Sequence, residues 1–141
     1  MTLVSVGYGG HASADAFSDQ LLTTGTTLLV DVRLNPISRK PGFSKKQLTA
    51  ALAEVGIEYL HERALGNPQD NRDAFARGDP AARERMRQIV RRSDALARLV
   101  ERAQKESVAV MCLCAEQSKC HRDVIIEEAL KLDPTLEVVP M

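Results

Sequence analysis

Apolar residues along the chain follow two periodicities, which predict alternating strands and helices. Nearly continuous apolar runs at residues 3–6, 27–32, 57–60, 108–112 and 136–139 are typical of short buried strands. Apolar positions at helical spacing predict helices over residues 14–24, 44–54, 83–105 and 120–132. Ser93 and Asp94 are good capping residues and divide the third of these into two helices. Residues 65–80 have few apolar anchors and are interpreted as a mobile loop or lid.

Strands that alternate with helices are typical of an α/β fold. We therefore expect a mostly parallel central sheet of about five strands with helices on both faces. A chain of 141 residues is long enough for one domain with a proper core, so residues 1–141 are expected to form a single domain.

The chain has no net charge that would give it a strong electrostatic field of one sign, because 19 Lys and Arg residues balance 19 Asp and Glu residues. Basic residues nevertheless gather locally, within residues 32–53 and along residues 72–105. No apolar run is long enough to cross a bilayer and no signal pattern is present, so no membrane partner is expected. The 3 cysteines cluster instead of spreading into a disulfide framework, which favours a reducing, cytoplasmic setting.

Polar residues follow several of the predicted strands, at the edge where parallel sheets bind ligands. Five reactive or charged side chains follow the strand at 108–112. They are the thiol of Cys114, the carboxylate of Glu116 and, in consecutive positions, the thiol of Cys120, the imidazole of His121 and the guanidinium of Arg122. The cysteines, His121 and Glu116 are candidates for nucleophilic or proton-transfer roles, and Arg122 for holding an oxyanion. Cys112 lies inside the strand and is interpreted as a core residue.

The loops after the first three strands add donors and positive charge at the same edge. Asp31, Arg33, Ser38 and Arg39 follow the second strand; Gly7, Tyr8 and His11 follow the first; and His61 follows the third. Asp31 is a candidate for proton transfer. The other residues named after the first and second strands are candidates for substrate binding. A phosphate, a sulfate or a nucleic-acid backbone is the natural complement of such a surface.

The same residues include potential metal ligands, namely His11, His61, Cys114, Cys120 and His121. The spacing typical of zinc sites, C-x2-C or H-x3-H, is missing. The sequence therefore predicts no metal site and no cofactor.

Four segments together resemble the DUF488 family: VGYGG, DVRLNPISRKPGFSKKQL, GIEYLHERALGNP and VMCLCAEQSKCHR. The resemblance covers nearly the whole chain. It implies a compact α/β domain of bacteria and archaea, whose hallmark segments fall on Gly7, on Asp31, Arg33, Pro36, Ser38 and Arg39, and on Cys114, Glu116, Cys120, His121 and Arg122. It implies no established mechanism. A weaker likeness is to rhodanese-type and phosphatase-type domains, although the Cys114-to-Arg122 spacing is longer than theirs.

Three functions remain open on these observations. The first is an enzyme, a hydrolase or transferase, that acts on a phosphorylated, nucleotide or nucleic-acid substrate through the Cys-His-Arg loop. The second is a rhodanese-like thiol enzyme for sulfur transfer or redox chemistry, with Cys114 or Cys120 as the carrier. The third is a non-catalytic nucleic-acid-binding module that uses the basic segments. The oligomeric state is left open.

Overall fold

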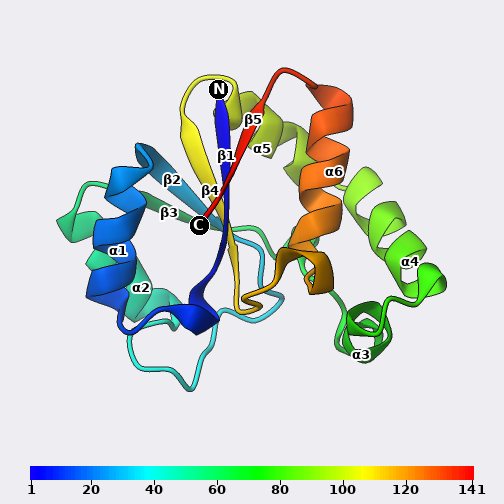
Figure 1. Ribbon diagram of the computed structural model, residues 1–141, viewed down its shortest axis with the longest axis horizontal. Helices are drawn as coiled ribbons and strands as arrows, with labels where there is room; N and C mark the ends of the chain where they lie inside the picture. Colours follow the sequence, from blue (N-terminus) through cyan, green and yellow to red (C-terminus); the bar gives the residue numbers. More distant parts are fainter.

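A computed structural model describes residues 1–141 and shows an α/β fold built on one five-stranded sheet (Figure 1). All strand pairs are parallel, in the order β3-β2-β4-β1-β5. The strands are β1 (Thr2–Gly7), β2 (Thr26–Asp31), β3 (Glu58–His61), β4 (Ser107–Cys112) and β5 (Glu137–Pro140). The expected fold class is therefore confirmed, with every strand parallel.

The helices are α1 (Ala14–Thr23), α2 (Lys45–Glu54), α3 (Arg72–Ala76), α4 (Pro80–Arg91), α5 (Asp94–Ala103) and α6 (Arg122–Leu132). As expected, the 83–105 segment divides near Ser93, whose side chain accepts a hydrogen bond from the Ala95 amide and caps α5. The expected start of the last helix at Cys120 is wrong by two residues, since α6 begins at Arg122. Cys120 stays extended in the preceding loop.

Helices cover both faces of the sheet, and alternate strand residues point into two separate cores. In β4, Val108 and Val110 lie in the larger core, whereas Ala109 and Met111 lie in the smaller one. Helices α1 and α2 close the smaller core on one side (Figure 1). Helices α5 and α6 lie on the other side, and α4 packs against both of them.

Residues 65–80 are more regular than a loop or lid. A short 3-10 turn, Arg63–Leu65, ends where the segment begins, and the segment itself contains a second one, Gln69–Asn71, and the helix α3. Leu65 and Phe75 are buried in the larger core, and the side chain of Asn71 donates to the Ala82 carbonyl oxygen. The expectation of an irregular loop was wrong. The buried residues of this segment occur singly and do not repeat at helical spacing, so the sequence pattern did not indicate its helix and turns.

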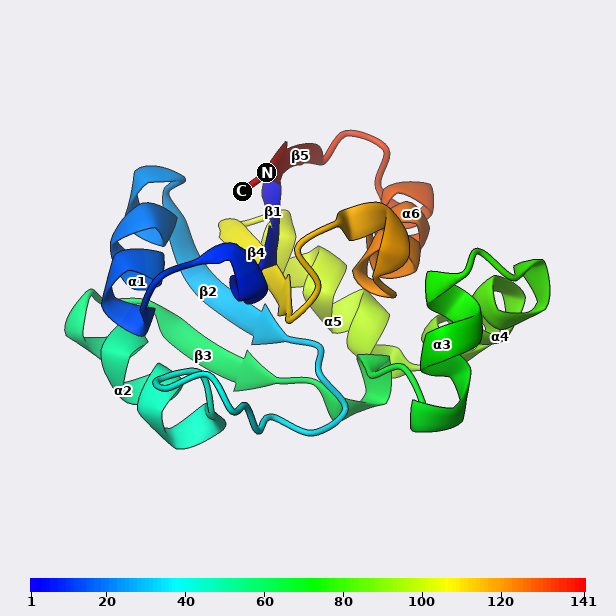
Figure 2. The ribbon, with the colours of Figure 1, turned by 60° about the horizontal axis from the view of Figure 1, so that its bottom comes forward.

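The carboxyl ends of β1, β2 and β4 finish side by side. Gly7 is in register with Cys112, and Asp31 with Met111. Figure 2 turns this edge forward and shows the following loops lying next to one another. A Cβ atom on Gly7 would lie 1.7 Å from the carbonyl oxygen of Cys114, so the two loops approach too closely for any other residue.

None of the helices is long and apolar enough to cross a membrane.

Candidate functional site

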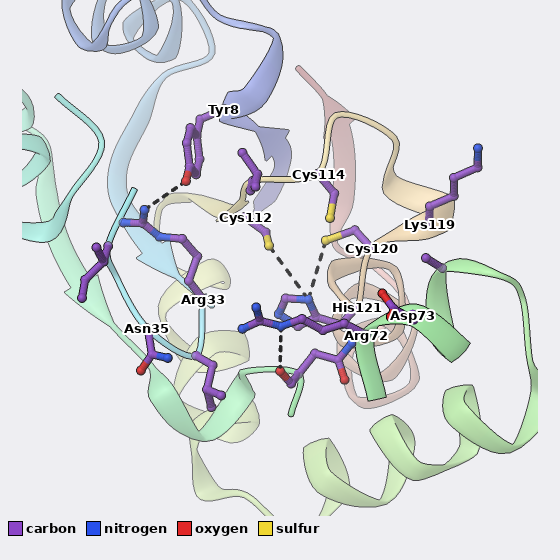
Figure 3. Close-up of a pocket in the computed structure, with 15 residues that line it drawn as sticks. Tyr8, Arg33, Asn35, Arg72, Asp73, Cys112, Cys114, Lys119, Cys120 and His121 are labelled. Carbon is purple, nitrogen blue, oxygen red and sulfur yellow. Dashed lines mark hydrogen bonds between the residues drawn. The ribbon is translucent and has the colours of Figure 1, made fainter. Parts of the chain in front are cut away.

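A cavity of about 290 Å³ opens at this edge, and we call it the site cavity. Its floor is formed by Cys112, Cys114, Cys120 and His121, which we call the cysteine–histidine cluster (Figure 3). Its walls come from the loops after β1, β2 and β4 and from α3 with the segment before it. The wall residues are Tyr8, Arg33, Leu34, Asn35, Ile37, Asn67, Arg72, Asp73, Ala76, Leu113 and Lys119. Loops distant in sequence thus meet around one hollow.

The cysteine–histidine cluster is mostly shielded from solvent. Cys112 is 7% exposed, Cys120 is 1% exposed and His121 is 6% exposed, whereas Cys114 is half-buried. The Nδ1 atom of His121 lies 3.7 Å from the Cys120 sulfur and 4.0 Å from the Cys112 sulfur. The Cys114 sulfur lies beside that of Cys120 (Figure 3). Cys114 is therefore the thiol that a molecule in the cavity reaches most easily.

A backbone contact fixes the ring of His121. Its Nε2 lies 2.8 Å from the carbonyl oxygen of Val32, just beyond β2. A carbonyl only accepts, so Nε2 carries the proton and the lone pair of Nδ1 faces the sulfurs. Burial lowers the pKa of His121, and the bond to Val32 opposes this in part. The imidazole is accordingly held neutral in one tautomer.

Hydrogen bonds among the three thiols couple their ionisation. The pKa of Cys112 is lowered to about 3, because Cys114 and Cys120 donate to its sulfur and the amides of Leu113 and Cys114 add to this. The same contacts raise the pKa of Cys114 and of Cys120, since each donates to the Cys112 thiolate.

Arg122 lies behind the cluster, away from the cavity wall. It is 2% exposed; its Nε donates to Ser5 Oγ at 2.9 Å and its Nη1 to the Cys114 carbonyl oxygen at 2.8 Å. The Nη1 atom also lies 3.6 Å from the Cys120 sulfur. Arg122 does not line the cavity, so its guanidinium contacts the loop after β4 where a grip on a bound anion was expected.

Arg33 lines the cavity but is already paired. Its Nη2 lies 2.7 Å from Asp31 Oδ2, and its Nη1 donates to Tyr8 Oη and to the Phe43 carbonyl oxygen. Burial alone would lower the pKa of Arg33, but its hydrogen bonds and the charge of Asp31 outweigh burial and raise it. Asp31 is fully buried and also accepts from Tyr59. Asp31 is therefore a partner of Arg33 beneath the wall and does not face the cavity.

Of the two remaining candidates after β1, Tyr8 lines the cavity and His11 does not. Tyr8 forms part of the wall and stacks on Phe43. The carbonyl oxygen of His11 accepts from Lys40, and its ring packs edge-on against Phe17.

Three further candidates do not reach the cavity. Ser38 accepts from the Lys40 amide within its own loop. Arg39 is exposed, and Glu116 is exposed and paired with Lys119 at 3.4 Å.

Sequence reasoning missed Arg72, Asp73 and Lys119 as lining residues. Its assignment of Cys112 to the core is confirmed, but it did not show that Cys112 also lines the cavity. Arg72 and Asp73 lie on the segment that was interpreted as a lid, so no pattern placed them beside the cysteines. Cys112 and Cys114 are two residues apart near a strand end, which puts their side chains on one face. That spacing was a usable signal for Cys112.

The basic surface of α4 and α5 is largely neutralised by acidic neighbours. Ion pairs engage these arginines: Arg83 with Asp123 and Glu127, Arg85 with Asp70, Arg87 with Glu84 and Glu127, Arg91 with Glu128, Arg98 with Glu62, and Arg102 with Glu58 and Glu106. Among the arginines of this surface only Arg92 forms no ion pair. The surface therefore offers little unpaired charge to a nucleic acid.

Comparisons with known proteins agree with the resemblance seen in the sequence. A search of curated proteins finds no match, and neither does a search of solved structures. The family model described as "Domain of unknown function DUF488" matches residues 13–129. The matched part includes β2, β4 and the whole cysteine–histidine cluster. The chain therefore belongs to the DUF488 family.

Proposed function

We propose that the protein is an enzyme, a hydrolase or transferase, that binds a small anionic substrate in the site cavity and acts on it beside the cysteine–histidine cluster. The observation that carries this proposal is the lining of the cavity. Three cationic side chains, Arg33, Arg72 and Lys119, surround it against one carboxylate, Asp73. Reactive side chains and cationic groups thus share one concave site, which is the usual basis for inferring an active site.

The size of the cavity limits the substrate. Small-molecule pockets run from about 300 to 1,000 Å³, and this one lies at the lower end. A phosphorylated metabolite or a mononucleotide is of suitable size, whereas a nucleic acid would have to enter by one end or one extruded group. The paired surface of α4 and α5 gives a longer nucleic acid no further support.

Two of the cationic residues have no strong partner: Lys119 has one exposed ion pair, with Glu116 at 3.4 Å, which a bound anion can replace. Arg72 and Lys119 are exposed at the mouth, and Arg72 makes only a long hydrogen bond of 3.4 Å to the Asn67 carbonyl oxygen. Arg33 is fixed by Asp31 and contributes a rigid donor to the wall. We assign recognition of the anion to Arg72 and Lys119, and shaping of the wall to Arg33.

Titration calorimetry with inorganic phosphate, sulfate and a nucleoside monophosphate tests the proposal. We expect binding of at least one anion, and no binding of the matching uncharged nucleoside. Because a hydrogen bond to a charged group contributes about 1.5–3 kcal/mol, Arg72→Ala should weaken binding by about tenfold or more. Arg92→Ala is the matched control, an exposed arginine away from the cavity, and should bind like the unmutated protein. Equal binding by Arg72→Ala and the unmutated protein would refute the assignment.

A second function, sulfur transfer, is favoured by one observation: Cys114 is half-buried and lines the cavity. In such a reaction the Cys114 thiolate takes the outer sulfur of thiosulfate, releases sulfite and passes the sulfur to cyanide as thiocyanate. Thiocyanate formation that is lost in Cys114→Ser would support this function. No thiocyanate from the unmutated protein would exclude it.

A further inference from the structure

We propose that Cys112, Cys120 and His121 bind one thiophilic divalent cation, Zn²⁺ in the first place, at the floor of the site cavity. The two cysteines and the histidine would be the protein ligands, and a fourth coordination position would face the cavity. The site goes beyond the proposed function, because it depends on these three side chains and not on the anion.

The two nitrogen-to-sulfur distances are close to the edge of a zinc tetrahedron. Zn–S bonds of about 2.3 Å and Zn–N bonds of about 2.0–2.1 Å place a sulfur and a nitrogen ligand about 3.6 Å apart. Nδ1 of His121 lies 3.7 Å and 4.0 Å from the two sulfurs. All three ligand atoms lie within 4.8 Å of one another. Zn–S bonds of about 2.3 Å place two sulfur ligands about 3.8 Å apart, so the two sulfurs would have to approach each other by up to about 1 Å to complete the ligand set.

The tautomer of His121 is the one that a metal ligand needs. Its Nε2–H donates to the Val32 carbonyl oxygen, which leaves the Nδ1 lone pair directed at the sulfurs. Metal-bound histidines commonly donate their other N–H to a backbone carbonyl in this way, which fixes the ring and raises the basicity of the ligand nitrogen.

Burial and charge also favour a soft divalent cation. Two thiolates neutralise a divalent ion, and the nearby Arg122 guanidinium, 3.6 Å from the Cys120 sulfur, stabilises thiolate charge. Sulfur and imidazole ligands select Zn²⁺ over Mg²⁺ or Ca²⁺, which prefer oxygen. Because all three ligands line the site cavity, the ion would face any molecule bound there. Three protein ligands with one open position are the arrangement of catalytic zinc sites.

The usual sequence signature is missing because the ligands come from two places. Cys112 is the last residue of β4, whereas Cys120 and His121 immediately precede α6. The intervening loop folds back over the strand end and brings them together. Adjacent Cys120 and His121 can both contribute because His121 uses Nδ1, the ring nitrogen nearer its own backbone.

Cobalt titration of the full-length protein, reduced and stripped of metal with a chelator, tests the proposal. Co²⁺ should bind one ion per chain, with thiolate-to-cobalt charge-transfer absorption and the intense visible bands of tetrahedral cobalt. Zn²⁺ should displace it, and Mg²⁺ should not. Because even loss of a supporting contact costs about 10–100-fold in metal affinity, Cys112→Ser and Cys120→Ser should weaken binding by about 100-fold or more.

Cys114→Ser is the matched control, since Cys114 belongs to the cysteine–histidine cluster but not to the three proposed ligands. This variant should keep its affinity within about tenfold, a smaller loss than removal of a ligand causes. A loss as large as in Cys112→Ser would overturn the assignment.

X-ray absorption of the zinc-loaded, unmutated protein covers the case in which the serine variants do not fold. Two sulfurs should appear at about 2.3 Å, with nitrogen at about 2.0–2.1 Å. A shell of oxygen and nitrogen alone, or the absence of charge-transfer absorption with cobalt, would refute the metal site. Neither result bears on anion binding, so failure of the two proposals can be told apart.

Discussion

The Nε2 atom of His121 lies 2.8 Å from the carbonyl oxygen of Val32. This bond joins the loop after β4 to the loop after β2, and β2 and β4 are neighbouring strands in the sheet. It sets the imidazole orientation from which the arrangement of the cysteine–histidine cluster follows. The floor of the site cavity is thus held in place by the main chain.

Gly7→Ala should destabilise the protein and disturb the cluster. The added Cβ would lie 1.7 Å from the carbonyl oxygen of Cys114, which also accepts from Arg122. Overpacking costs about 1–3 kcal/mol, and a displaced Cys114 would add to this. Denaturant unfolding measures the loss.

Gly10→Ala is the matched control for Gly7→Ala, because its Cβ would meet nothing within 4 Å. We expect a stability equal to that of the unmutated protein or slightly above it. Equal stability of the two variants would contradict the close approach of the loops.

Asp31→Asn should be among the most damaging single changes. Asp31 and Arg33 form a buried pair at 2.7 Å, and removal of one partner leaves an uncompensated buried charge. Breaking such a pair costs about 3–5 kcal/mol. Urea unfolding of the variant measures this effect.

A double variant, Asp31→Leu with Arg33→Met, should recover part of that loss because it removes both charges. Glu84→Gln, in an exposed pair with Arg87, should change stability little. If Asp31→Asn were as mild as Glu84→Gln, the buried pair would not have the assigned role.

Stability should fall in acid partly through Glu128. Burial would raise the pKa of Glu128, but hydrogen bonds with Arg91 and Lys131 outweigh burial and lower it. A lowered pKa in the folded state gives a stabilisation that is present above the ordinary value of 4.5 and is lost as the pH falls through the folded pKa. Glu128→Gln should therefore be less stable than the unmutated protein at pH 7.

The difference between Glu128→Gln and the unmutated protein should shrink in acid, where the carboxyl of Glu128 is protonated in both states. Denaturant unfolding over a pH series checks this. A difference that grows as the pH falls would reverse the sign and contradict the pairing of Glu128.

The sequence predicted the fold well because its strands are continuous apolar runs and its helices are amphipathic. It also predicted the sheet edge at which Cys114, Cys120 and His121 lie, because the carboxyl ends of parallel strands all lie at one edge of the sheet. It could not show that Arg122 turns inward to Ser5, because side-chain direction at the start of a helix depends on tertiary packing. The position of Arg72 beside the cavity could not be predicted either, because α3 is a five-residue helix whose one buried residue gives no periodic pattern.

The protein should not bind duplex DNA or RNA in a salt-dependent manner. The arginines of α4 and α5 are mostly held in ion pairs, so few counterions would be released on binding. A gel-shift series from low to physiological salt tests this. Binding in the gel that weakens steeply with salt would contradict this prediction and favour the nucleic-acid-binding function.

A crystal grown with selenate tests the central claim most directly, because selenate imitates sulfate or phosphate and its selenium scatters anomalously. We predict an anomalous peak inside the site cavity, within hydrogen-bonding distance of Arg72 or Lys119. Selenium found only at outer surfaces, with the cavity free of anion, would contradict the proposed binding of an anionic substrate.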